Sequence, residues 1–137
     1  MTFLAILASI YLGANGSLQL PQGGGDMARR GGGAIRAGWY ASDFWAIEGE
    51  AGWMERQASL AVKGLWHWWG YERFDPFFTF GARGWFPKGE AGPCAGTGFF
   101  YHLTDHWSLR ADAEATLGLE RDVEMVYMLG AGVQYEF

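Results

Sequence analysis

The sequence predicts an all-β fold, namely an eight-stranded antiparallel up-and-down transmembrane β-barrel that occupies residues 1–137 as a single domain. Apolar and polar residues alternate along most of the chain from residue 34 onward, with the period of two that is typical of a β-strand. Glycine is abundant, at 22 of 137 residues, and aromatic residues make up 18%. The sequence contains no run of about 18 apolar residues, the length of a transmembrane helix, so we expect strands to cross the membrane.

The N-terminal apolar segment Phe3–Leu12 admits two interpretations. It is apolar enough for the core of a signal peptide, but no Lys or Arg precedes it and no small-x-small cleavage motif follows it. The alternative is a membrane-facing first strand over residues 2–13, with one face formed by Leu4, Ile6, Ala8, Ile10 and Leu12. We favour the strand, because it brings the total to eight and bacterial single-chain membrane barrels have an even number of strands.

Alternation predicts seven further strands, over residues 34–41, 44–55, 58–70, 76–86, 94–103, 107–120 and 123–137. The clearest is the segment that starts at Trp107. Its odd-numbered positions are all apolar, whereas its even-numbered positions include Arg110, Asp112 and Glu114. Strands of soluble proteins usually run about 5–6 residues, so alternation over this whole segment favours a strand that crosses a bilayer.

The connections between these strands fall into two groups. Tight turns are expected at one end of the barrel, at residues 41–43, 71–75 and 104–106. The other end is expected to hold one long loop and several short connections, over 14–33 and near 55–57, 87–93 and 120–123. The long loop contains glycine runs around Arg29 and Arg30. We expect these two arginines to be solvated, with contact to anionic lipopolysaccharide as the alternative.

Side-chain volume decides which strand faces point into the barrel. The interior of an eight-stranded barrel is only just wide enough for side chains, so the bulky apolar faces should point outward, to lipid. The opposite faces carry the charged residues expected in the lumen, namely Arg36, Glu48, Glu50, Lys63, Arg83, Arg110, Asp112, Glu114 and Glu136. Because unpaired charges are costly in a low-dielectric interior, these side chains should pair into a network that plugs the lumen and excludes an open porin.

Two groups of aromatic residues lie near the predicted strand ends. One flanks the tight turns and the other lies toward the opposite end: Trp45, Trp68, Phe78, Trp107, Tyr135 and Phe137, and then Trp53 and Phe86. Two such groups are typical of the aromatic girdles at the membrane–water interfaces of a barrel. Ordinary cross-strand aromatic packing in a soluble sheet is the alternative.

The sequence offers little for catalysis or cofactor chemistry. The single Cys94 has no second cysteine with which to form a disulfide within the chain, and three scattered histidines make a poor metal site. A net charge of −5 disfavours nucleic acid as a partner. We therefore predict no catalytic residue, no cofactor and no metal. One alternative stays open, in which His102 and Ser108, with Glu136 nearby, act on lipids in a barrel enzyme.

Three segments resemble those of a known group of membrane barrels. Residues 130–137 (GAGVQYEF) resemble its closing strand with the terminal phenylalanine. Residues 103–110 (LTDHWSLR) and 74–84 (FDPFFTFGARG) resemble its turns into strands seven and five. Over about residues 34–137, the chain thus resembles the small outer-membrane β-barrel proteins of Gram-negative bacteria, the OmpA-like/OmpX-like eight-stranded group.

This resemblance implies an integral protein of the bacterial outer membrane, with both termini in the periplasm and with outer-membrane lipids and lipopolysaccharide around it. It also implies that Val133, Tyr135 and Phe137 belong to the signal that the barrel-assembly machinery reads. We expect a monomer with a structural or surface-interaction role, the latter through the 14–33 loop, and without enzymatic activity. A soluble lipocalin-like ligand-binding barrel is a further alternative.

Overall fold

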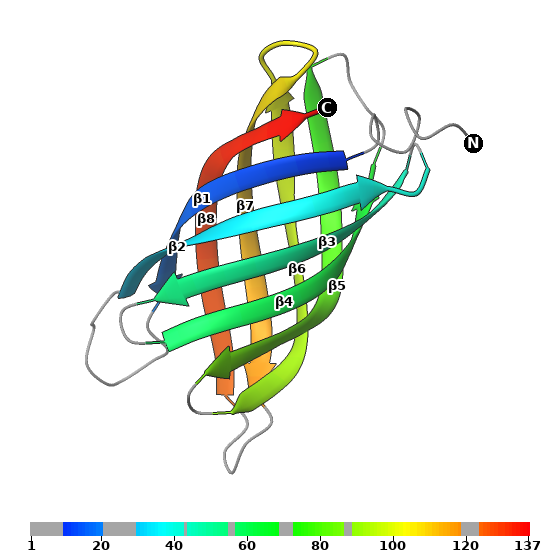
Figure 1. The fold of residues 1–137 in the computed structure, drawn as a ribbon. Helices are drawn as coiled ribbons and strands as arrows, with labels where there is room; N and C mark the ends of the chain where they lie inside the picture. The colour runs from blue at the N-terminus through cyan, green and yellow to red at the C-terminus, as the bar shows by residue number, and fades with distance from the viewer. Residues whose placement is uncertain are drawn as a thin grey trace.

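The computed structural model is a closed antiparallel β-barrel, whose sheet winds around a central lumen (Figure 1). It describes residues 10–20, 30–42, 44–54, 57–68, 73–86, 89–118 and 124–137. Within these ranges the chain forms eight strands, which are β1 (Ile10–Leu20), β2 (Arg30–Tyr40), β3 (Trp45–Met54), β4 (Gln57–His67), β5 (Phe74–Phe86), β6 (Glu90–His102), β7 (Trp107–Gly118) and β8 (Glu124–Glu136). The predicted fold class is therefore confirmed. The same ranges contain no helix that is long and apolar enough to span a membrane.

Each strand pairs with the next in sequence, and the barrel closes where β1 pairs with β8. The closing register runs from Tyr11 opposite Glu136 to Leu20 opposite Tyr127. The start of β1 and the end of β8 therefore lie at the same end of the barrel. We call this the turn end, because the connection between β6 and β7 also lies there. The opposite end, which includes the end of β3 and the start of β4, is called the loop end.

Side chains alternate between the lumen and the exterior along the strands, with the faces that the sequence predicts. On β4, Leu60 and Val62 are 57% and 65% exposed, whereas Lys63 is 1% exposed. On β3, Ile47 is exposed and its neighbour Glu48 is fully buried. Large apolar side chains thus cover the outside, and charged side chains lie inside. This arrangement is the reverse of the usual one in a water-soluble protein.

The prediction for the N-terminal part of the chain is wrong in its bounds. The first strand is Ile10–Leu20 rather than 2–13, and β2 already begins at Arg30. The loop predicted over 14–33 is therefore in large part strand. Its remaining residues, and the side chains of Arg29 and Arg30, lie outside the described part of the chain, as do residues 1–9. The loop predicted at 87–93 is also wrong in part, because β6 begins at Glu90.

Small residues explain why these strand segments were not predicted. Between Leu12 and Leu18, strand β1 carries only small and polar residues, so its alternation is weak. In β2, a Cβ atom added to Gly33 would lie 2.7 Å from the ring of Trp53 on β3. The place of a side chain at Gly38 is taken by the ring of Tyr11, which lies opposite it on β1. These glycines of β2 make room for aromatic neighbours and do not mark a flexible loop.

Apolar side chains fill the lumen near the turn end. The cluster consists of Tyr11, Ala46, Leu65, Phe77 and Phe100, with Tyr40 packed against it. Toward the loop end, the lumen-facing positions of β2, β3, β4, β5 and β7 become charged, as in the step from Ala46 to Glu48 and from Leu65 to Lys63. The fold therefore places the charged side chains in the middle of the barrel, on the loop-end side of this apolar cluster, which we call the aromatic layer.

Candidate functional site

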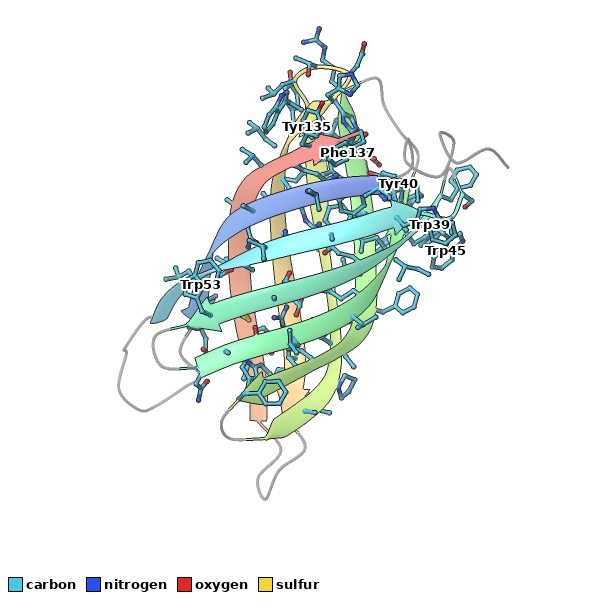
Figure 2. All side chains as sticks on the ribbon, viewed as in Figure 1. Trp39, Tyr40, Trp45, Trp53, Tyr135 and Phe137 are labelled. Atoms are coloured by element: carbon cyan, nitrogen blue, oxygen red, sulfur yellow. The ribbon has the colours of Figure 1, made fainter. Side chains whose placement is uncertain are left out.

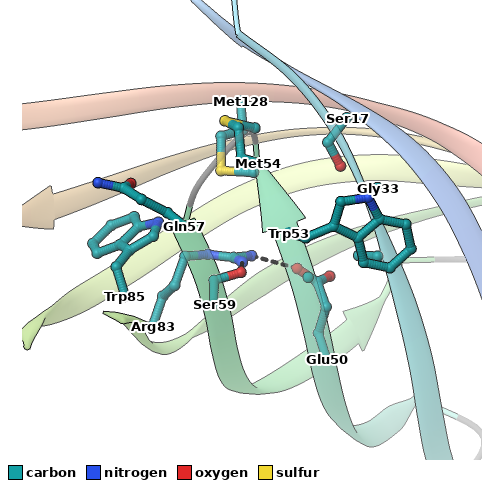
Figure 3. Close-up of a pocket in the computed structure, with 12 residues that line it drawn as sticks. Ser17, Gly33, Glu50, Trp53, Met54, Gln57, Ser59, Arg83, Trp85 and Met128 are labelled. Atoms are coloured by element: carbon teal, nitrogen blue, oxygen red, sulfur yellow. Dashed lines mark hydrogen bonds and ion pairs between the residues drawn. The ribbon is translucent and has the colours of Figure 1, made fainter. Parts of the chain in front are cut away.

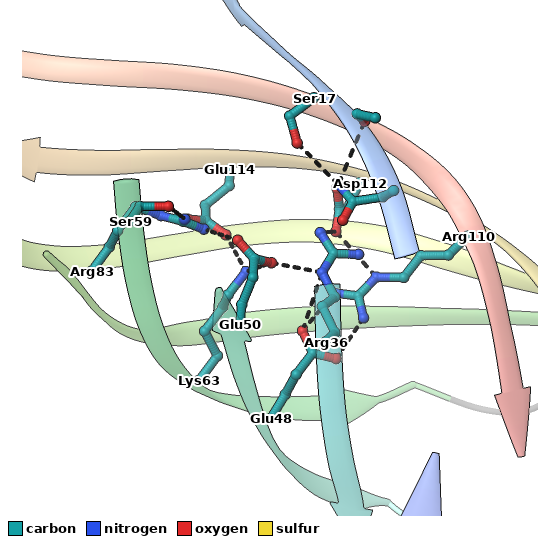
Figure 4. A network of polar contacts seen from close by, with 12 residues as sticks. Ser17, Arg36, Glu48, Glu50, Ser59, Lys63, Arg83, Arg110, Asp112 and Glu114 are labelled. Carbon is teal, nitrogen blue, oxygen red and sulfur yellow. Dashed lines mark hydrogen bonds and ion pairs between the residues drawn. The ribbon is translucent and has the colours of Figure 1, made fainter. Parts of the chain in front are cut away.

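The buried charges of the lumen form one continuous ion-pair network (Figure 4). They come from β2, β3, β4, β5 and β7, whose lumen-facing positions meet inside the closed barrel. The members are Arg36, Lys63, Arg83, Arg110, Glu48, Glu50, Asp112 and Glu114. These are four cations and four carboxylates, so their formal charges cancel. None of these side chains is more than 11% exposed.

Arg110 forms the centre of one half of the network. Its guanidinium donates two hydrogen bonds to the carboxylate of Glu48, with Nη1–Oε2 at 2.6 Å and Nη2–Oε1 at 3.1 Å. The same group contacts Asp112 at 3.1 Å and lies over the rings of Phe77 and Phe100, 4.8 and 5.2 Å from their centroids. Arg110 therefore joins the charged layer to the aromatic layer through ion pairs and cation–π contacts.

The other half is built around two shared carboxylates. Lys63 Nζ lies 3.1 Å from Glu50 and 2.7 Å from Glu114. Arg83 Nη2 contacts the same two carboxylates at 2.7 and 2.8 Å, while its Nη1 donates to Ser59 Oγ at 3.2 Å. Each carboxylate is thus held between a lysine and an arginine, which leaves neither charge unpaired.

Arg36 links the two halves. Its Nε lies 2.6 Å from Glu50, and its Nη2 lies 3.0 Å from Asp112. Tyr11 adds a neutral donor, since its hydroxyl donates to Glu48 at 2.6 Å. The network thus joins lumen-facing side chains of five strands into one set of buried, paired charges.

Glu136 lies apart from this network, although the sequence places it on the same lumen face. Its side-chain Oε1 accepts hydrogen bonds from Tyr40 at 3.0 Å and from Gln134 at 3.3 Å. Asp112 pairs with Gly130 on β8, and Glu136 lies six residues further along that strand. At about 3.3 Å per residue this is roughly 20 Å, too far for contact. Alternation assigns the face of a residue but not its height in the barrel.

The predicted interface aromatics lie on or near the exterior at the two ends. In Figure 2, Trp45, Tyr135 and Phe137 lie toward the turn end, and Trp53 lies toward the loop end. Trp107 and Phe86 are also about half exposed, and Trp68 and Phe78 are 43% and 39% exposed.

Sequence reasoning left further exterior aromatics out of the interface groups. Trp66 stacks between Trp45 and Trp68, with ring centroids 6.3 and 6.5 Å apart, and Trp39 lies near the turn end (Figure 2). Both occupy outward positions of alternating segments. The number of residues between each of them and the nearest predicted turn was the signal that could have identified them as interface aromatics.

A second polar cluster lies at the turn end and includes a carboxylate that the sequence reasoning missed. His102 Nδ1 lies 2.7 Å from Ser108 Oγ, and His67 Nδ1 lies 2.9 Å from Asp75 Oδ2. His102 Nε2 is 3.8 Å from the same Asp75 oxygen. The carboxylate beside this serine and histidine is thus Asp75 and not Glu136. Ser108 is only 1% exposed, so its hydroxyl does not face the apolar exterior of the barrel.

Among the described residues, one small cavity adjoins the ion-pair network. This cavity, near the loop end, is lined by Glu50, Ser59 and Arg83 together with Trp85 and Met54 (Figure 3). It admits about one water molecule. Within the ranges that the structure describes, no three side chains of the ligating types converge on a position suited to a metal ion.

Comparison with solved structures places the fold among membrane barrels, whereas no family model and no curated protein matches the sequence. The N-terminal β-barrel domain of Pseudomonas aeruginosa OprF is similar with a TM-score of 0.74 at 18% identity, over 96% of this chain and 99% of that one. A de novo designed transmembrane β-barrel gives 0.74 at 14% identity, over 95% and 96%. The outer membrane protein OprG from P. aeruginosa gives 0.65 at 11% identity, over 96% and 97%. The resemblance to eight-stranded outer-membrane barrels is thus confirmed at the level of the fold.

Proposed function

We propose that this chain is an integral protein of the bacterial outer membrane, with a closed polar lumen and a structural or surface-interaction role. The observation that carries the proposal is the reversed distribution of polarity. A neutral ion-pair network lies inside the barrel, and large apolar side chains cover its outer surface. Contiguous apolar patches larger than a few hundred Å² are rare on water-soluble monomers. A bilayer is the solvent that suits this exterior, which disfavours a soluble lipocalin-like barrel.

The distribution of aromatic side chains supports a position across the bilayer. Trp39 and Trp45 lie toward the turn end, and Trp53 lies toward the loop end (Figure 2). Between the ends, the exterior is largely aliphatic, as at Ile47 and Val62. Transmembrane barrels carry such an apolar band between two aromatic girdles. The interface groups predicted from the sequence are proposed to be these girdles.

The turn end is proposed to face the periplasm and the loop end the cell surface, since outer-membrane barrels have their short turns on the periplasmic side. Both termini would then be periplasmic. Lipids and lipopolysaccharide would surround a monomeric barrel. Val133, Tyr135 and Phe137 are proposed to serve as the assembly signal, and the outward position of Val133 and Phe137, 46% and 51% exposed, suits recognition by a partner.

A closed lumen argues for a role other than that of a porin. The ion pairs of Arg36, Lys63, Arg83 and Arg110 occupy the middle of the barrel, and the cluster around Phe77 and Phe100 fills its turn end. Eight-stranded barrels have an interior just wide enough for side chains. Together these features support the proposal that the lumen is closed to solutes.

A non-enzymatic role is proposed because the pair of Ser108 and His102 is poorly placed for chemistry on lipids. Ser108 is sealed inside the lumen, and an acyl ester in the membrane would meet the exterior. Incubation of the folded wild-type protein with lipopolysaccharide and phospholipids should leave both unchanged by mass spectrometry. Turnover that is lost in Ser108→Ala would overturn this part of the proposal.

Insertion is tested by reconstitution of the chain into phospholipid vesicles that contain brominated acyl chains. Exterior tryptophans such as Trp66 should lose fluorescence, because bromine quenches indoles that lie in the hydrocarbon region. Vesicles with unbrominated lipids of the same headgroup provide the control. A chain that stays soluble without detergent, and whose fluorescence is the same in both vesicles, would contradict the proposed location.

A further inference from the structure

The contact between β1 and β8 is the seam where the two ends of the chain meet. Every other strand pair joins neighbours in sequence, whereas Tyr11 and Glu136 are separated by almost the whole chain. Closing so long a loop costs more conformational entropy than forming a hairpin. The seam is therefore the pairing that most needs contacts beyond its backbone ladder.

The central ion-pair network does little for this seam. All eight of its members lie on β2, β3, β4, β5 and β7, so no member comes from β1 or β8. The hydroxyl of Tyr11 reaches Glu48, which ties β1 to β3. Within the described ranges, no ion pair ties β8 to another strand. The lumen charges thus stabilise contacts among β2, β3, β4, β5 and β7. The β1–β8 seam must be stabilised by other groups.

Glu136, which lies apart from the network, is bound through both its carboxylate and its backbone at the turn end of this seam. Its carboxylate accepts a hydrogen bond from the hydroxyl of Tyr40 at 3.0 Å. Since Tyr40 is on β2 and Glu136 is on β8, this contact passes over the intervening β1. Tyr11, the residue of β1 opposite Glu136, packs against Tyr40 with ring centroids 5.2 Å apart.

His106 holds the backbone of the same residue from the turn between β6 and β7. The amide of Glu136 donates to the carbonyl of His106 at 2.7 Å, and His106 Nδ1 lies 2.8 Å from the carbonyl oxygen of Glu136. Because a carbonyl only accepts, Nδ1 carries the proton of this bond. The imidazole ring also stacks on Tyr135, with centroids 5.7 Å apart. One histidine thus fixes both the backbone and a side chain of the last strand.

We propose that Tyr40, His106 and Glu136 form a seam lock, in which the Tyr40–Glu136 hydrogen bond holds the β1–β8 seam shut at the turn end and His106 fixes Glu136 in position, and that the seam opens there as a unit before the rest of the barrel unfolds. Beyond the seam lock, the β1–β8 ladder ends with the hydrogen bond from the Phe137 amide to the Ile10 carbonyl, at 3.1 Å. Exchange of the Phe137 amide therefore reports opening of the seam. Sub-global opening of this kind is typical of units with few stabilising side-chain contacts.

Amide hydrogen exchange of the full chain, folded in detergent micelles, tests the seam lock. Tyr40→Phe removes only the hydroxyl, and His106→Leu removes the imidazole donor. Each should speed exchange of the Phe137 amide, whose hydrogen bond to the Ile10 carbonyl belongs to the β1–β8 ladder, by roughly two- to tenfold, the effect of one net hydrogen bond. Exchange in the β3–β4 ladder should not change. His106→Asn keeps a donor near the position of Nδ1 and should restore most of the protection.

Thr97→Val provides the matched control. Thr97 Oγ1 donates to the Phe77 carbonyl at 3.1 Å, so this variant also loses one hydroxyl donor, but between β5 and β6. It should leave the seam amides unchanged. Equal acceleration in all ladders, no acceleration at the seam in Tyr40→Phe, or seam acceleration by Thr97→Val would each overturn the proposal.

Discussion

Arg110 joins the two kinds of chemistry found in the lumen. Its guanidinium pairs with Glu48 through two hydrogen bonds and lies over Phe77 and Phe100. Replacing a buried ion pair by apolar groups is often tolerated, whereas removing one partner leaves a buried charge unpaired. The importance of Arg110 therefore comes from what its loss would leave behind at Glu48.

Arg110→Ala should lower the free energy of unfolding by about 3–5 kcal/mol, because the carboxylate of Glu48 would lose its bidentate partner in a buried setting. Urea unfolding in detergent micelles, followed by tryptophan fluorescence, measures the change. Arg73→Ala is the matched control, since Arg73 is exposed beside the turn and its loss should cost less than about 0.5 kcal/mol. Equal midpoints for Arg110→Ala and the wild type would contradict a dry, paired lumen.

The sequence predicts the faces of single residues well and their partners less well. Alternation places Arg110, Glu48 and Glu136 on the lumen face, where the structure also has them. It does not give the register between strands, so it could not separate Glu136 from the network. Asp75 was missed for a related reason, because the polar stretch before Pro76 looks like a turn, yet the residue belongs to β5.

Strand β2 depends on glycine where its neighbours are bulky. The ring of Tyr11 fills the space where a side chain at Gly38 would lie, and this packing helps to position the Tyr11 hydroxyl toward Glu48. Glycine inside a strand usually weakens it, unless another group approaches closely. Here the close approach exists, and the ring covers the glycine.

Gly38→Ala should therefore destabilise the barrel by about 1–3 kcal/mol, the usual cost of overpacking an interior. Gly16→Ala is the matched control on the neighbouring strand, because a Cβ added to Gly16 meets nothing within 4 Å. That variant should be neutral or slightly stabilising. Unfolding midpoints in urea compare the two. A Gly16→Ala loss as large as that of Gly38→Ala would refute the role assigned to the Tyr11 ring.

The same physics explains which elements were predictable. Strands such as β7 carry alternation strong enough to fix both their existence and their faces. Strand β1 and the start of β2 do not, since small residues suffice where the barrel wall is crowded, as at Gly33 beside Trp53. A run of glycines then looks like a loop. The even number of strands was right, but the segment chosen for the first strand began too early.

For the whole molecule, the pattern of alternation was enough to predict a closed barrel with an apolar exterior. Closure itself was predicted from the number of strands and from the narrow interior that eight strands allow. The neutrality of the network, with four charges of each sign, depends on which residues meet across the lumen. That property belongs to the three-dimensional arrangement and is absent from any single strand.

The proposed function requires that this barrel cross a membrane without offering an open path through it. Conductance across a planar lipid bilayer that contains the folded protein checks this requirement, with insertion verified by the loss of tryptophan fluorescence in brominated lipid. The paired lumen charges and the aromatic layer around Phe77 predict a current no greater than that of the protein-free bilayer. A stable, long-lived open-channel conductance of the wild-type protein would contradict it.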